Sequence, residues 1–455
     1  MISLIVCLDS RNGMSKDGNI PWNIPDDKKF FKNVTSEDGP NILVMGKNTF
    51  STMPFKVFSK QRQCYVVSTT LNNDEYSYVN YFKSFNELLV KINLETNKKS
   101  VNKVFCIGGK DLYIECMKEK IVDEIFITKL DKSYDCDQIL NLNLQEFSLI
   151  KCDKKDFGNV YVYKKTKANQ EFQYLNLMKN ILYTGKYRND RTNVGTISKF
   201  GQYLTFDISS EFPLLTTKKV YSKGVVEELL WFLKGDTNVN HLIDKKVHIW
   251  DGNSSREFMD SIGINREERD IGPCYGWQWR HVGGKYQTMH DDYTKCGFDQ
   301  LEYIVNEIQT NKYSRRIVLS AWNPPDLKEM NLPPCHVLYQ FYVEDEKLSC
   351  QMYQRSADVF LGLPFNIASS ALLCYIIANI CKLIPGNLNV CIGDAHIYQN
   401  HVNQCIEQLE KTPFNWCNLK INKQLTFDDL NNLDSSWIDI TNYSSHPTIK
   451  APMAI

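Results

Sequence analysis

The stretch NLPPCHVLYQFYVEDEKLSCQMYQ (331–354) combines a candidate strand pair with a cysteine at its entrance. Apolar residues alternate through HVLYQFYV, the polar run EDEK interrupts them, and alternation resumes in LSCQMYQ. A period of two is typical of strands, so we predict a β-hairpin that turns at Glu344 to Lys347. Helix-like segments on either side, VVEELLWFL (225–233) and NIASSALLCYIIANICKLI (366–384), indicate a mixed sheet with a long buried helix in an α+β fold.

The longest apolar segment, 366–384, raises the question of a membrane span. Polar residues interrupt it at Asn366, Ser369, Ser370, Asn379 and Lys382. A buried helix is therefore the better interpretation. The opening MISLIVCLDSRNG has no basic lead and too short an apolar run for a signal peptide, so we expect a first strand there.

The bulk composition is that of a globular protein with two domains. The chain has 455 residues, too many for one ordinary core, and 43% of them are hydrophobic and 23% charged. Lys+Arg and Asp+Glu both number 53, which gives no bias toward nucleic acid or a membrane surface. An odd count of 15 cysteines without a signal peptide predicts reduced thiols and a cytoplasmic location. No C-x-x-C pair occurs, and no metal site is predicted.

Strand-like and helix-like segments alternate through the N-terminal part of the chain. The strand-like segments are ISLIVCL (2–8), NILVMG (41–46), QCYVVS (63–68), KVFCIGG (103–109), DEIFITKL (123–130) and NVYVYKK (159–165). Helix-like segments such as PDDKKFFKNV and SFNELLVKI lie between several of them. This alternation predicts an α/β fold, with a doubly wound, mostly parallel sheet covered on both faces.

A polar break, TKANQ (166–170), ends this region. Helical spacing of apolar residues begins directly after it, in EFQYLNLMKNIL. We therefore expect a first domain at 1–167, a short junction at 168–170 and a second domain at 171–455.

Pro25, Asp26 and Asp27 stand where the first helix should begin. Free N–H groups and the helix dipole favour carboxylates there, so capping is a sufficient explanation of both aspartates. Asp27 also shares a helix face with Phe31, and Asp26 with Phe30. A carboxylate on an apolar face can hold or steer a proton, because burial disfavours its charged form. Spacing alone does not choose between the two aspartates.

Two strand-to-helix turns carry glycine. VMGKNTF (44–50) and FCIGGKDLY (105–113) each end an apolar strand in glycine and then begin a helix. Such a turn lets the backbone approach a phosphate and points helix N–H groups at it, although each alone is more often a simple tight turn.

Taken in order, MISLIVCL, GNIPWNIPDDKKFFKNVT, ILVMGKNTF, YVVSTT, VFCIGGKDLY and IFITKL closely resemble the dihydrofolate reductase family over residues 1–166. The resemblance implies that Asp27 holds the pterin ring and assists its protonation, and that Thr128 bonds to Asp27. It also implies that Phe31 packs on the folate and that Arg62 meets its glutamate carboxylate. Further folate contacts implied by the family are Val6, Cys7 and Ile107.

The same resemblance implies NADPH as the cofactor of this domain. Its contacts would be Gly46, Lys47, Asn48, Thr49, Ser68, Thr69, Gly108, Gly109, Lys110, Leu112 and Tyr113. Lys47 near Ser68 and Thr69 suits a 2′-phosphate, which favours NADPH over NADH.

Cys335 is the most conspicuous of the cysteines, because PPCH places it beside a histidine. His336, as a sequence neighbour on a strand, would point to the opposite side, so a Cys-His dyad of neighbours is geometrically disfavoured. A buried, inert thiol remains a sufficient explanation of the residue alone. Arginines in YRNDRT, SRRIVLSAWN and QRSADVF could stabilise its thiolate and bind a phosphate if they converge on it.

The segments EELLWFLKGDTN, IWDGNSSREF, GPCYGWQWRH, SRRIVLSAWNP, PPCHVLYQFYV, QRSADVFLGLPFNIAS, GDAHIYQNH and IKAPMAI follow one another in this order. They resemble the thymidylate synthase family over roughly 171–455. The resemblance implies that Cys335 adds to C6 of deoxyuridylate (dUMP). C5 then becomes enolate-like and attacks the one-carbon unit of 5,10-methylenetetrahydrofolate.

The family resemblance also assigns the rest of the synthase site. The dUMP contacts would be Arg191, Arg315, Arg316, Gln354, Arg355, Ser356, Asp358, Asn366, His396 and Tyr398. Arg315 and Arg316 would come from the partner subunit of a homodimer. Glu228 and Tyr275 would organise water and the proton that leaves C5. Together with Asp27 of the first domain, the catalytic candidates are Cys335, Glu228, Tyr275, Arg355, Asp358 and Asn366. The folate side of the pocket would be formed by Trp250, Asn253, Asp358, Gly362 and Ala454.

Together the two resemblances imply a fusion like the bifunctional dihydrofolate reductase-thymidylate synthases of protozoa and plants. The synthase would convert dUMP to thymidylate (dTMP) and release dihydrofolate, which the reductase would return to tetrahydrofolate. One alternative is a catalytically degenerate folate- and nucleotide-binding scaffold with a single active half. Another is an oxidoreductase joined to a cysteine hydrolase, which would need a histidine and an acid arranged to activate Cys335.

Overall fold

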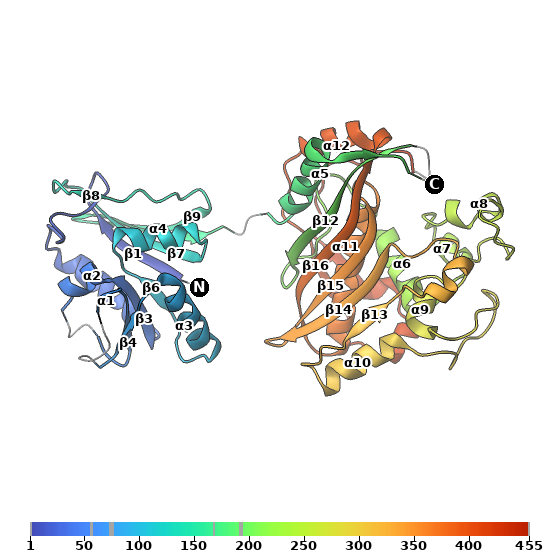
Figure 1. The fold of residues 1–455 in the computed structure, drawn as a ribbon, viewed down its shortest axis with the longest axis horizontal. Helices are drawn as coiled ribbons and strands as arrows, with labels where there is room; N and C mark the ends of the chain where they lie inside the picture. The colour runs from blue at the N-terminus through green and yellow to red at the C-terminus, as the bar shows by residue number, and fades with distance from the viewer. Residues whose placement is uncertain (1, 55–57, 72–76, 167–168, 191–193, 454–455) are drawn as a thin grey trace. The chain divides into compact units, whose positions relative to one another are not determined.

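The structure is a computed structural model of the chain, and it describes residues 2–54, 58–71, 77–166, 169–190 and 194–453. The chain divides into two compact units, Met1–Ala168 and Asn169–Ile455 (Figure 1). Each unit has its own main sheet and its own hydrophobic core.

The described residues of the first unit form a sheet of eight strands in the order β5-β4-β3-β6-β1-β7-β10-β9. These strands are β1 (Ile2–Leu8), β3 (Asn41–Gly46), β4 (Arg62–Val67), β5 (Val79–Phe82), β6 (Val104–Cys106), β7 (Val122–Leu130), β9 (Phe147–Lys155) and β10 (Gly158–Lys165). Pairing is parallel from β5 through β7, and β10 and β9 extend the sheet in antiparallel fashion. A small separate pair joins β2 (Gly13–Ser15) to β8 (Gln138–Ile139).

Helices cover both faces of this sheet. They are α1 (Pro25–Ser36), α2 (Lys47–Thr52), α3 (Phe85–Asn97) and α4 (Lys110–Lys118). Leu4 packs in one core with residues of α3 and α4, whereas its neighbour Ile5 packs in another core with Phe50 of α2. Successive strand residues point to opposite faces, so this division buries both sides of β1. The predicted α/β fold with a mostly parallel, doubly covered sheet is confirmed.

The second unit contains a mixed sheet with the order β11-β12-β16-β15-β14-β13 among the residues described. Its strands are β11 (Lys186–Arg188), β12 (Thr196–Asp207), β13 (Val318–Ser320), β14 (His336–Glu344), β15 (Lys347–Asp358) and β16 (Ile384–Tyr398). The predicted hairpin is present, since β14 pairs with β15 up to Glu344 opposite Lys347. Asp345 and Glu346 turn the chain with φ of 47° and 59°.

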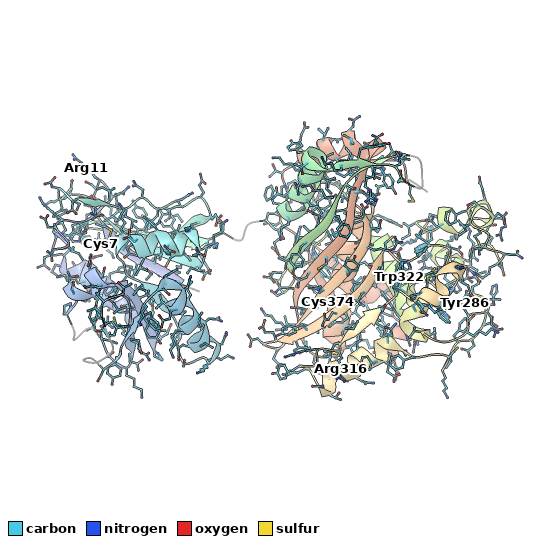
Figure 2. The ribbon with its side chains drawn as sticks, in the orientation of Figure 1. Cys7, Arg11, Tyr286, Arg316, Trp322 and Cys374 are labelled. Carbon is cyan, nitrogen blue, oxygen red and sulfur yellow. The ribbon has the colours of Figure 1, made fainter. Side chains whose placement is uncertain are left out.

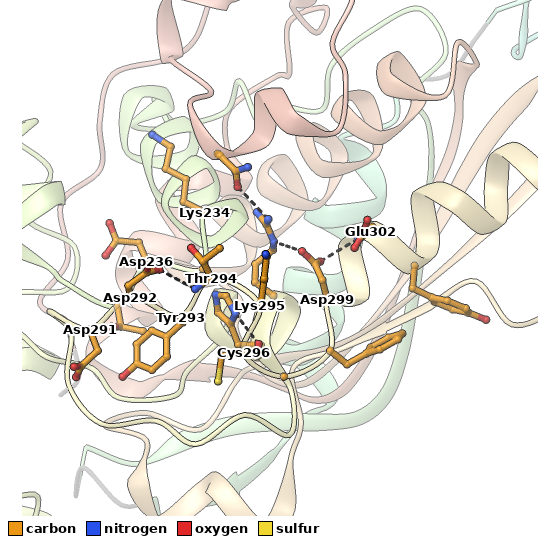
Figure 3. Close-up of a pocket in the computed structure, with 18 of the residues that line it drawn as sticks. Lys234, Asp236, Asp291, Asp292, Tyr293, Thr294, Lys295, Cys296, Asp299 and Glu302 are labelled. Carbon is orange, nitrogen blue, oxygen red and sulfur yellow. Dashed lines mark hydrogen bonds and ion pairs between the residues drawn. The ribbon is translucent and has the colours of Figure 1, made fainter.

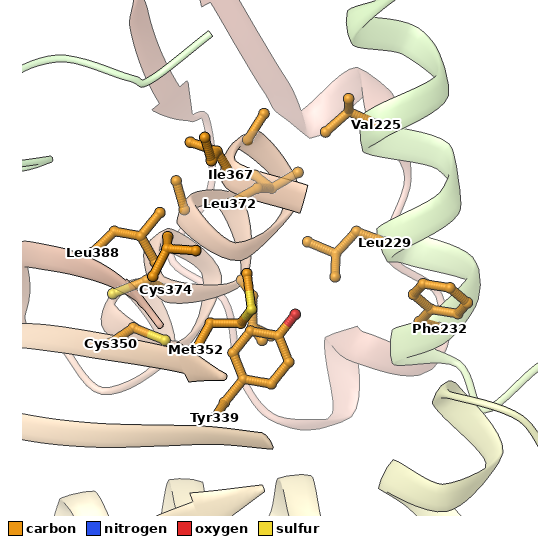
Figure 4. Close-up of a cluster of buried hydrophobic side chains, with 14 of the residues drawn as sticks. Val225, Leu229, Phe232, Tyr339, Cys350, Met352, Ile367, Leu372, Cys374 and Leu388 are labelled. Atoms are coloured by element: carbon orange, nitrogen blue, oxygen red, sulfur yellow. The ribbon is translucent and has the colours of Figure 1, made fainter. Parts of the chain in front are cut away.

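One face of this sheet is covered by the buried helix α11 (Gly362–Ile380). Side chains of α11, β14 and β15 interlock with Val225, Leu229 and Phe232 of α6 (Ser222–Leu233), as Figure 4 shows. Although α11 is long and apolar enough to cross a membrane, 78% of its apolar window is buried inside the unit. The predicted core helix is thus confirmed, but its bounds at 366–384 were wrong. The chain leaves the helix at Ile380, Lys382 has a φ of 57°, and Ile384 already begins β16.

The opposite face of the sheet presents a row of apolar and aromatic side chains. Tyr203 pairs with Cys391, Cys391 with Tyr353, and Tyr353 with Leu338, across four neighbouring strands. Tyr203 is 57% exposed and Tyr353 is 41% exposed. This face therefore carries an exposed row of apolar and aromatic side chains.

Shorter elements surround the sheet of the second unit. They are α5 (Phe172–Thr184), α7 (Asn240–Asp244), α8 (Arg256–Ser261), α9 (Gly276–His281), α10 (Gln300–Thr310), α12 (Val402–Leu409) and the strand pair β17 (Asn418–Ile421) and β18 (Ile438–Thr441).

Candidate active sites

Asp27, in the first turn of α1, faces two neighbouring strands. Cys7 on β1 and Thr128 on β7 are register partners, and both side chains hydrogen-bond to the Asp27 carboxylate. Figure 2 marks Cys7 in this unit. Asp27 is half-buried, whereas Asp26 is exposed. Burial therefore separates the two aspartates that spacing left equivalent.

The pKa of Asp27 is raised above its ordinary value. Burial is the largest cause, and it outweighs the hydrogen bonds from Thr128 and Cys7, which lower the pKa. Burial and the charge of Asp27 raise the pKa of Cys7 far above the usual thiol range. Cys7 is therefore a neutral hydrogen-bond donor beside Asp27, while Asp27 can carry a proton nearer to neutral pH than an exposed aspartate can.

Arg62 and Phe31 are joined through α1. Arg62 Nη1 lies 3.3 Å from Thr35 Oγ1, and the Thr35 hydroxyl donates to the Phe31 carbonyl at 2.7 Å. Arg62 is 8% exposed, and burial lowers its pKa. Both predicted folate contacts are thus joined to α1, since Phe31 belongs to this helix and Arg62 contacts its Thr35. The further folate candidates Val6 and Ile107 are buried, one in each of the two cores that cover the same sheet.

The two glycine turns lie side by side. β3 and β6 are adjacent parallel strands, and each runs directly into a helix, α2 after Gly46 and α4 after Gly109. The Gly46 N–H donates to the Gly108 carbonyl at 2.8 Å, which joins the two turns. The free N–H groups at the starts of α2 and α4 thus meet at one edge of the sheet, and this arrangement suits a phosphate. The remaining NADPH candidates on these helices are Asn48, Thr49, Lys110, Leu112 and Tyr113.

Lys47 lies beside the end of β4. Its Nζ donates to Thr70 Oγ1 at 2.9 Å, and Thr70 Oγ1 lies 3.4 Å from Ser68 Oγ. The amine and two hydroxyls make a small cationic group suited to an anion. Thr70, which the sequence did not single out, therefore joins Ser68 and Lys47 in this group, while the predicted NADPH contact of Thr69 stays a prediction.

Cys335 lies at the entrance of β14 and is held from both sides. Its N–H donates to Tyr275 Oη at 2.8 Å. Arg355 donates from Nε to the Pro334 carbonyl at 2.8 Å and from Nη2 to the Pro333 carbonyl at 2.7 Å. Burial raises the pKa of the Cys335 thiol, and the charge of Arg355 opposes that rise without cancelling it. The chain therefore positions the thiol and supplies one cation to it.

His336 takes no part in activating the neighbouring thiol. The ring is 4% exposed, and burial lowers its pKa to about 3. Its Nδ1 lies 3.0 Å from Tyr339 Oη, and the ring packs on Tyr275 with centroids 4.6 Å apart. His336 is thus a neutral core residue that supports Tyr275.

The predicted arginines do not all converge on Cys335 within one chain. Arg355 does, and its guanidinium also lies over Trp322 at 5.6 Å. Arg315 and Arg316 are exposed at the far end of β14, because Ile317 O accepts from Phe341 N at 2.9 Å (Figure 2 marks Arg316). Phe341 is six residues beyond Cys335 on an extended strand, about 20 Å at a rise of roughly 3.3 Å per residue. Arg191 and Ala454 lie outside the described residues.

Asn366 on α11 is oriented by a buried glutamine. Gln354 donates from Nε2 to Asn366 Oδ1 at 2.9 Å and to the Ser356 carbonyl at 3.0 Å. Because its oxygen already accepts a bond, Asn366 keeps its amide N–H groups available for an acceptor in the pocket.

The pairing of β15 with β16 brings residues predicted to contact the phosphate, the ribose and the folate close to one another. Ser356 and Asp358 on β15 pair with Asp394 and His396 on the parallel strand β16. The His396 ring contacts the Tyr398 ring with centroids 5.1 Å apart. Gly362, the first residue of α11, lies beside Asp358, since a Cβ added to it would be in ordinary van der Waals contact with Asp358 Cβ at 3.7 Å. Asn253 lies in the short helix Gly252–Ser254, where its carbonyl accepts a hydrogen bond from Asn331.

Glu228 is a carboxylate with an unusual environment. Burial raises its pKa to about 7, although the Trp250 Nε1–H donates to its Oε1 at 2.8 Å and lowers the pKa. The adjacent Glu227 is instead paired with Lys245 at 2.5 Å. Glu228 is therefore half ionised near neutral pH, as a residue that accepts and returns protons should be.

We expect Trp250→Phe to move the acidic limb of the synthase kcat profile to higher pH. The variant removes the donor that stabilises ionised Glu228, and one hydrogen bond to a charged group corresponds to about one pH unit or more. The measurement is kcat for dTMP formation between pH 5.5 and 9. An unchanged profile, or an equal loss at every pH, would contradict this role of the indole.

A separate cavity of about 860 Å³ lies away from these residues, near α9 and α10 (Figure 3). Its wall mixes Lys234, Lys295 and several acidic residues. Arg280 donates to Asp299 at 2.7 Å and to Asn431 at 3.0 Å, so its charge is neutralised within the wall. None of the predicted site residues is among the described residues that line this cavity.

Comparisons with known proteins match each unit to a family. The dihydrofolate reductase family model matches residues 1–170, and the thymidylate synthase family model matches residues 172–455. Curated relatives span both units. "Bifunctional dihydrofolate reductase-thymidylate synthase 2" of Arabidopsis thaliana is 40% identical, covering 99% of this chain and 88% of its own length. The "bifunctional dihydrofolate reductase-thymidylate synthase" of Zea mays is 40% identical, and the match covers 97% of this chain and 95% of the relative. The protein of the same name from Paramecium tetraurelia is also 40% identical, and the match covers 100% of this chain and 98% of the relative.

Proposed function

Because the chain belongs to the bifunctional dihydrofolate reductase-thymidylate synthase family, we propose that the residues gathered around Cys335 and Asp27 carry its two reactions. The enzyme converts dUMP to dTMP with 5,10-methylenetetrahydrofolate, and it reduces the resulting dihydrofolate with NADPH. The observation that best supports the assignment is the hydrogen bonding around Cys335. Tyr275 accepts from the Cys335 N–H, and Arg355 donates to the carbonyls of the two prolines that precede it.

In the synthase reaction, the Cys335 thiolate adds to C6 of dUMP, and the electron pair of the C5–C6 bond moves to C5. C5 then bonds to the one-carbon unit of the folate, and the C5 proton leaves toward Glu228 and Tyr275. The bond of the one-carbon unit to N10 breaks when C5 attacks, and the electron pair of the lost C5–H bond then expels N5, which leaves a methylene group on C5. Hydride transfer from the folate to this methylene and cleavage of the C6–S bond, which returns the thiolate, give dTMP and dihydrofolate. Asn366 reads the amide edge of the uracil, and Arg355 with Ser356 holds the phosphate.

In the reductase reaction, Asp27 holds the pterin ring and supports its protonation. Its raised pKa supports this role. The joined glycine turns and the group of Lys47, Ser68 and Thr70 fit the pyrophosphate and 2′-phosphate of NADPH. When bound, NADPH supplies the hydride for the pterin. Arg62, the first residue of β4, binds the glutamate carboxylate of the folate, and its contact with Thr35 of α1, the helix of Phe31, supports this role.

The catalytic domains run from 1 to 167 and from 171 to 455, with 168–170 as the junction. The division of the chain into Met1–Ala168 and Asn169–Ile455 supports this assignment. A cytoplasmic location is supported by the free state of all 15 cysteines and by the burial of α11 in a core.

The functional synthase is a homodimer that shares its active sites. Its support is the exposed row of Tyr203, Tyr353 and their neighbours, together with the long distance from Arg316 to Cys335 in one chain. Arginines from a second copy would add the positive charge that the Cys335 thiol lacks, and they would complete a phosphate site.

Two inactive variants should restore activity when they assemble together. A Cys335→Ala chain keeps Arg315 and Arg316, and a chain with both arginines changed to Ala keeps Cys335. Random assortment makes half of the dimers mixed, and each mixed dimer has one complete site of two, so co-expression should give about a quarter of wild-type synthase activity. Activity equal to the sum of the two parents would mean that the arginines serve their own chain.

A further inference from the structure

His401 ends the motif GDAHIYQNH and lies in the short helix Gln399–His401. It is completely buried. Its ring packs against the rings of Phe360 and Tyr398, with centroids 5.5 Å away in each case. These contacts fix the plane of the imidazole, so each ring nitrogen has a defined neighbour.

The two nitrogens face different parts of the site. Nε2 lies 2.7 Å from the Pro452 carbonyl in the C-terminal segment. A carbonyl can only accept, so Nε2 carries the hydrogen. Nδ1 lies 3.8 Å from Asp358 Oδ1, and it is buried without a hydrogen-bond partner among the described residues. A neutral ring would point a lone pair at the carboxylate, whereas a protonated ring points an N–H at it.

The charged groups facing His401 are Asp358 and Lys218. Burial lowers the pKa of His401, but Asp358 and the Pro452 carbonyl raise it more, so the net direction is upward; Lys218 opposes the rise. Lys218 itself is buried, donates to the Phe360 carbonyl and lies 3.5 Å from the centre of the Phe360 ring.

Asp358 is also fixed by the backbone just before α11, through the same oxygen that lies nearest His401. Its Oδ1 accepts from the N–H groups of Phe360 at 3.0 Å and Leu361 at 3.2 Å. The carboxylate therefore contacts both this turn and the His401 ring. A displacement of His401 would act on the Asp358 carboxylate through this contact and on the C-terminal segment through Pro452.

We infer that His401 is a positioning residue for the folate half of the synthase reaction, because its ring ties the C-terminal segment at Pro452 to the carboxylate of Asp358. The inference rests on the proposed function and on the place that the family resemblance gives Asp358, on the folate side of the pocket. It predicts that loss of the ring weakens binding of methylenetetrahydrofolate much more than binding of dUMP: Asp358 and Tyr398 are also dUMP candidates, but the contact at Pro452 reaches the C-terminal segment on the folate side.

The experiment compares His401→Leu with His401→Gln in the full-length enzyme. Leucine fills the space without a donor, whereas glutamine can still donate to Pro452 but cannot be charged. His446 provides the matched control, because its Nε2 also lies against a backbone carbonyl, that of Thr412 at 2.9 Å, and the residue is only half-buried. His446→Leu should change neither substrate constant.

We expect His401→Leu to raise the KM for methylenetetrahydrofolate about tenfold, because it removes both the hydrogen bond to the Pro452 carbonyl and the charge that faces Asp358. The Kd for dUMP should stay within about twofold, and the reductase kcat of the same chain measures the amount of active enzyme. His401→Gln should recover most of the loss at high pH. In the wild type, the KM should rise as pH increases through the raised pKa of His401, above 6.5, because the charged ring is lost. The Gln variant should lack that rise.

Equal losses for dUMP and methylenetetrahydrofolate in a folded His401→Leu enzyme would overturn the inference, as would an unchanged folate KM. A wild type that makes no dTMP would instead refute the proposed function, so the two failures are distinguishable.

Discussion

Cys335→Ala is expected to lower dTMP formation by about 10⁴-fold or more, because removing the nucleophile removes the covalent step itself. The hydrogen bonds of Arg355 to the Pro333 and Pro334 carbonyls do not depend on the Cys335 side chain, so dUMP should still bind. The measurement is release of dihydrofolate from methylenetetrahydrofolate and dUMP without NADPH, followed by absorbance. Reduction of added dihydrofolate with NADPH should be unchanged.

Cys296→Ala is the matched control for this result. Cys296 is half-buried like Cys335, but it lines the separate cavity near α9. Its loss should leave both activities intact. If Cys335→Ala still produced dTMP, the nucleophile would have to be another group.

Asp27→Asn is expected to reduce reductase kcat at pH 7 by about 10²- to 10³-fold, the usual range for loss of a positioned proton donor. An amide has the size of the acid but cannot supply a proton. In the wild type, activity should fall as pH rises through the raised pKa of Asp27, because the protonated carboxyl is then lost. The variant lacks this titration. Its deficit should therefore shrink at low pH, where solvent can protonate the substrate.

Asp26→Asn is the matched control, since Asp26 is the exposed neighbour in the same helical turn. It should leave reductase turnover unchanged, and both variants should keep full synthase activity. Equal turnover of Asp27→Asn and the wild type at neutral pH would remove Asp27 from the mechanism.

The sequence predicted the features of the fold that depend on local periodicity. Alternation gave the hairpin of β14 and β15, and the order of strand-like and helix-like segments gave the doubly covered sheet. The end of α11 was missed because apolar residues continue beyond Ile380 into β16, so hydrophobicity does not mark the boundary. The family resemblances, carried by many ordered motifs, were confirmed by the family models over both units.

Contacts between distant segments could not be predicted in the same way. Asp27 differs from Asp26 because Thr128, about a hundred positions away, lies beside it. Thr70 and His401 acquire their partners only when separate strands and the C-terminal segment meet. A histidine in GDAHIYQNH gives no sign of a neighbour at Pro452.

The structure also bears on the alternatives. A cysteine hydrolase needs a base for Cys335, but the adjacent His336 is buried, has a pKa of about 3 and is engaged by Tyr339. The relatives that span both units are bifunctional enzymes by name, and nothing among them favours a degenerate scaffold.

The separation of Arg316 from Cys335 along β14 has a genetic consequence. In a shared site, a chain without its arginine pair inactivates the site that contains its partner's Cys335. The site that contains its own Cys335 still receives the partner's arginines. A cell with one normal and one arginine-deficient allele would place the defective chain in most of its dimers. In a mixed dimer, the defective chain would silence the cysteine of the normal chain, while the arginines of the normal chain would complete the site of the defective chain. Both kinds of allele would therefore leave half of the sites active, but an arginine allele removes the activity of the normal chain's cysteine, whereas a Cys335 allele removes only the activity of its own.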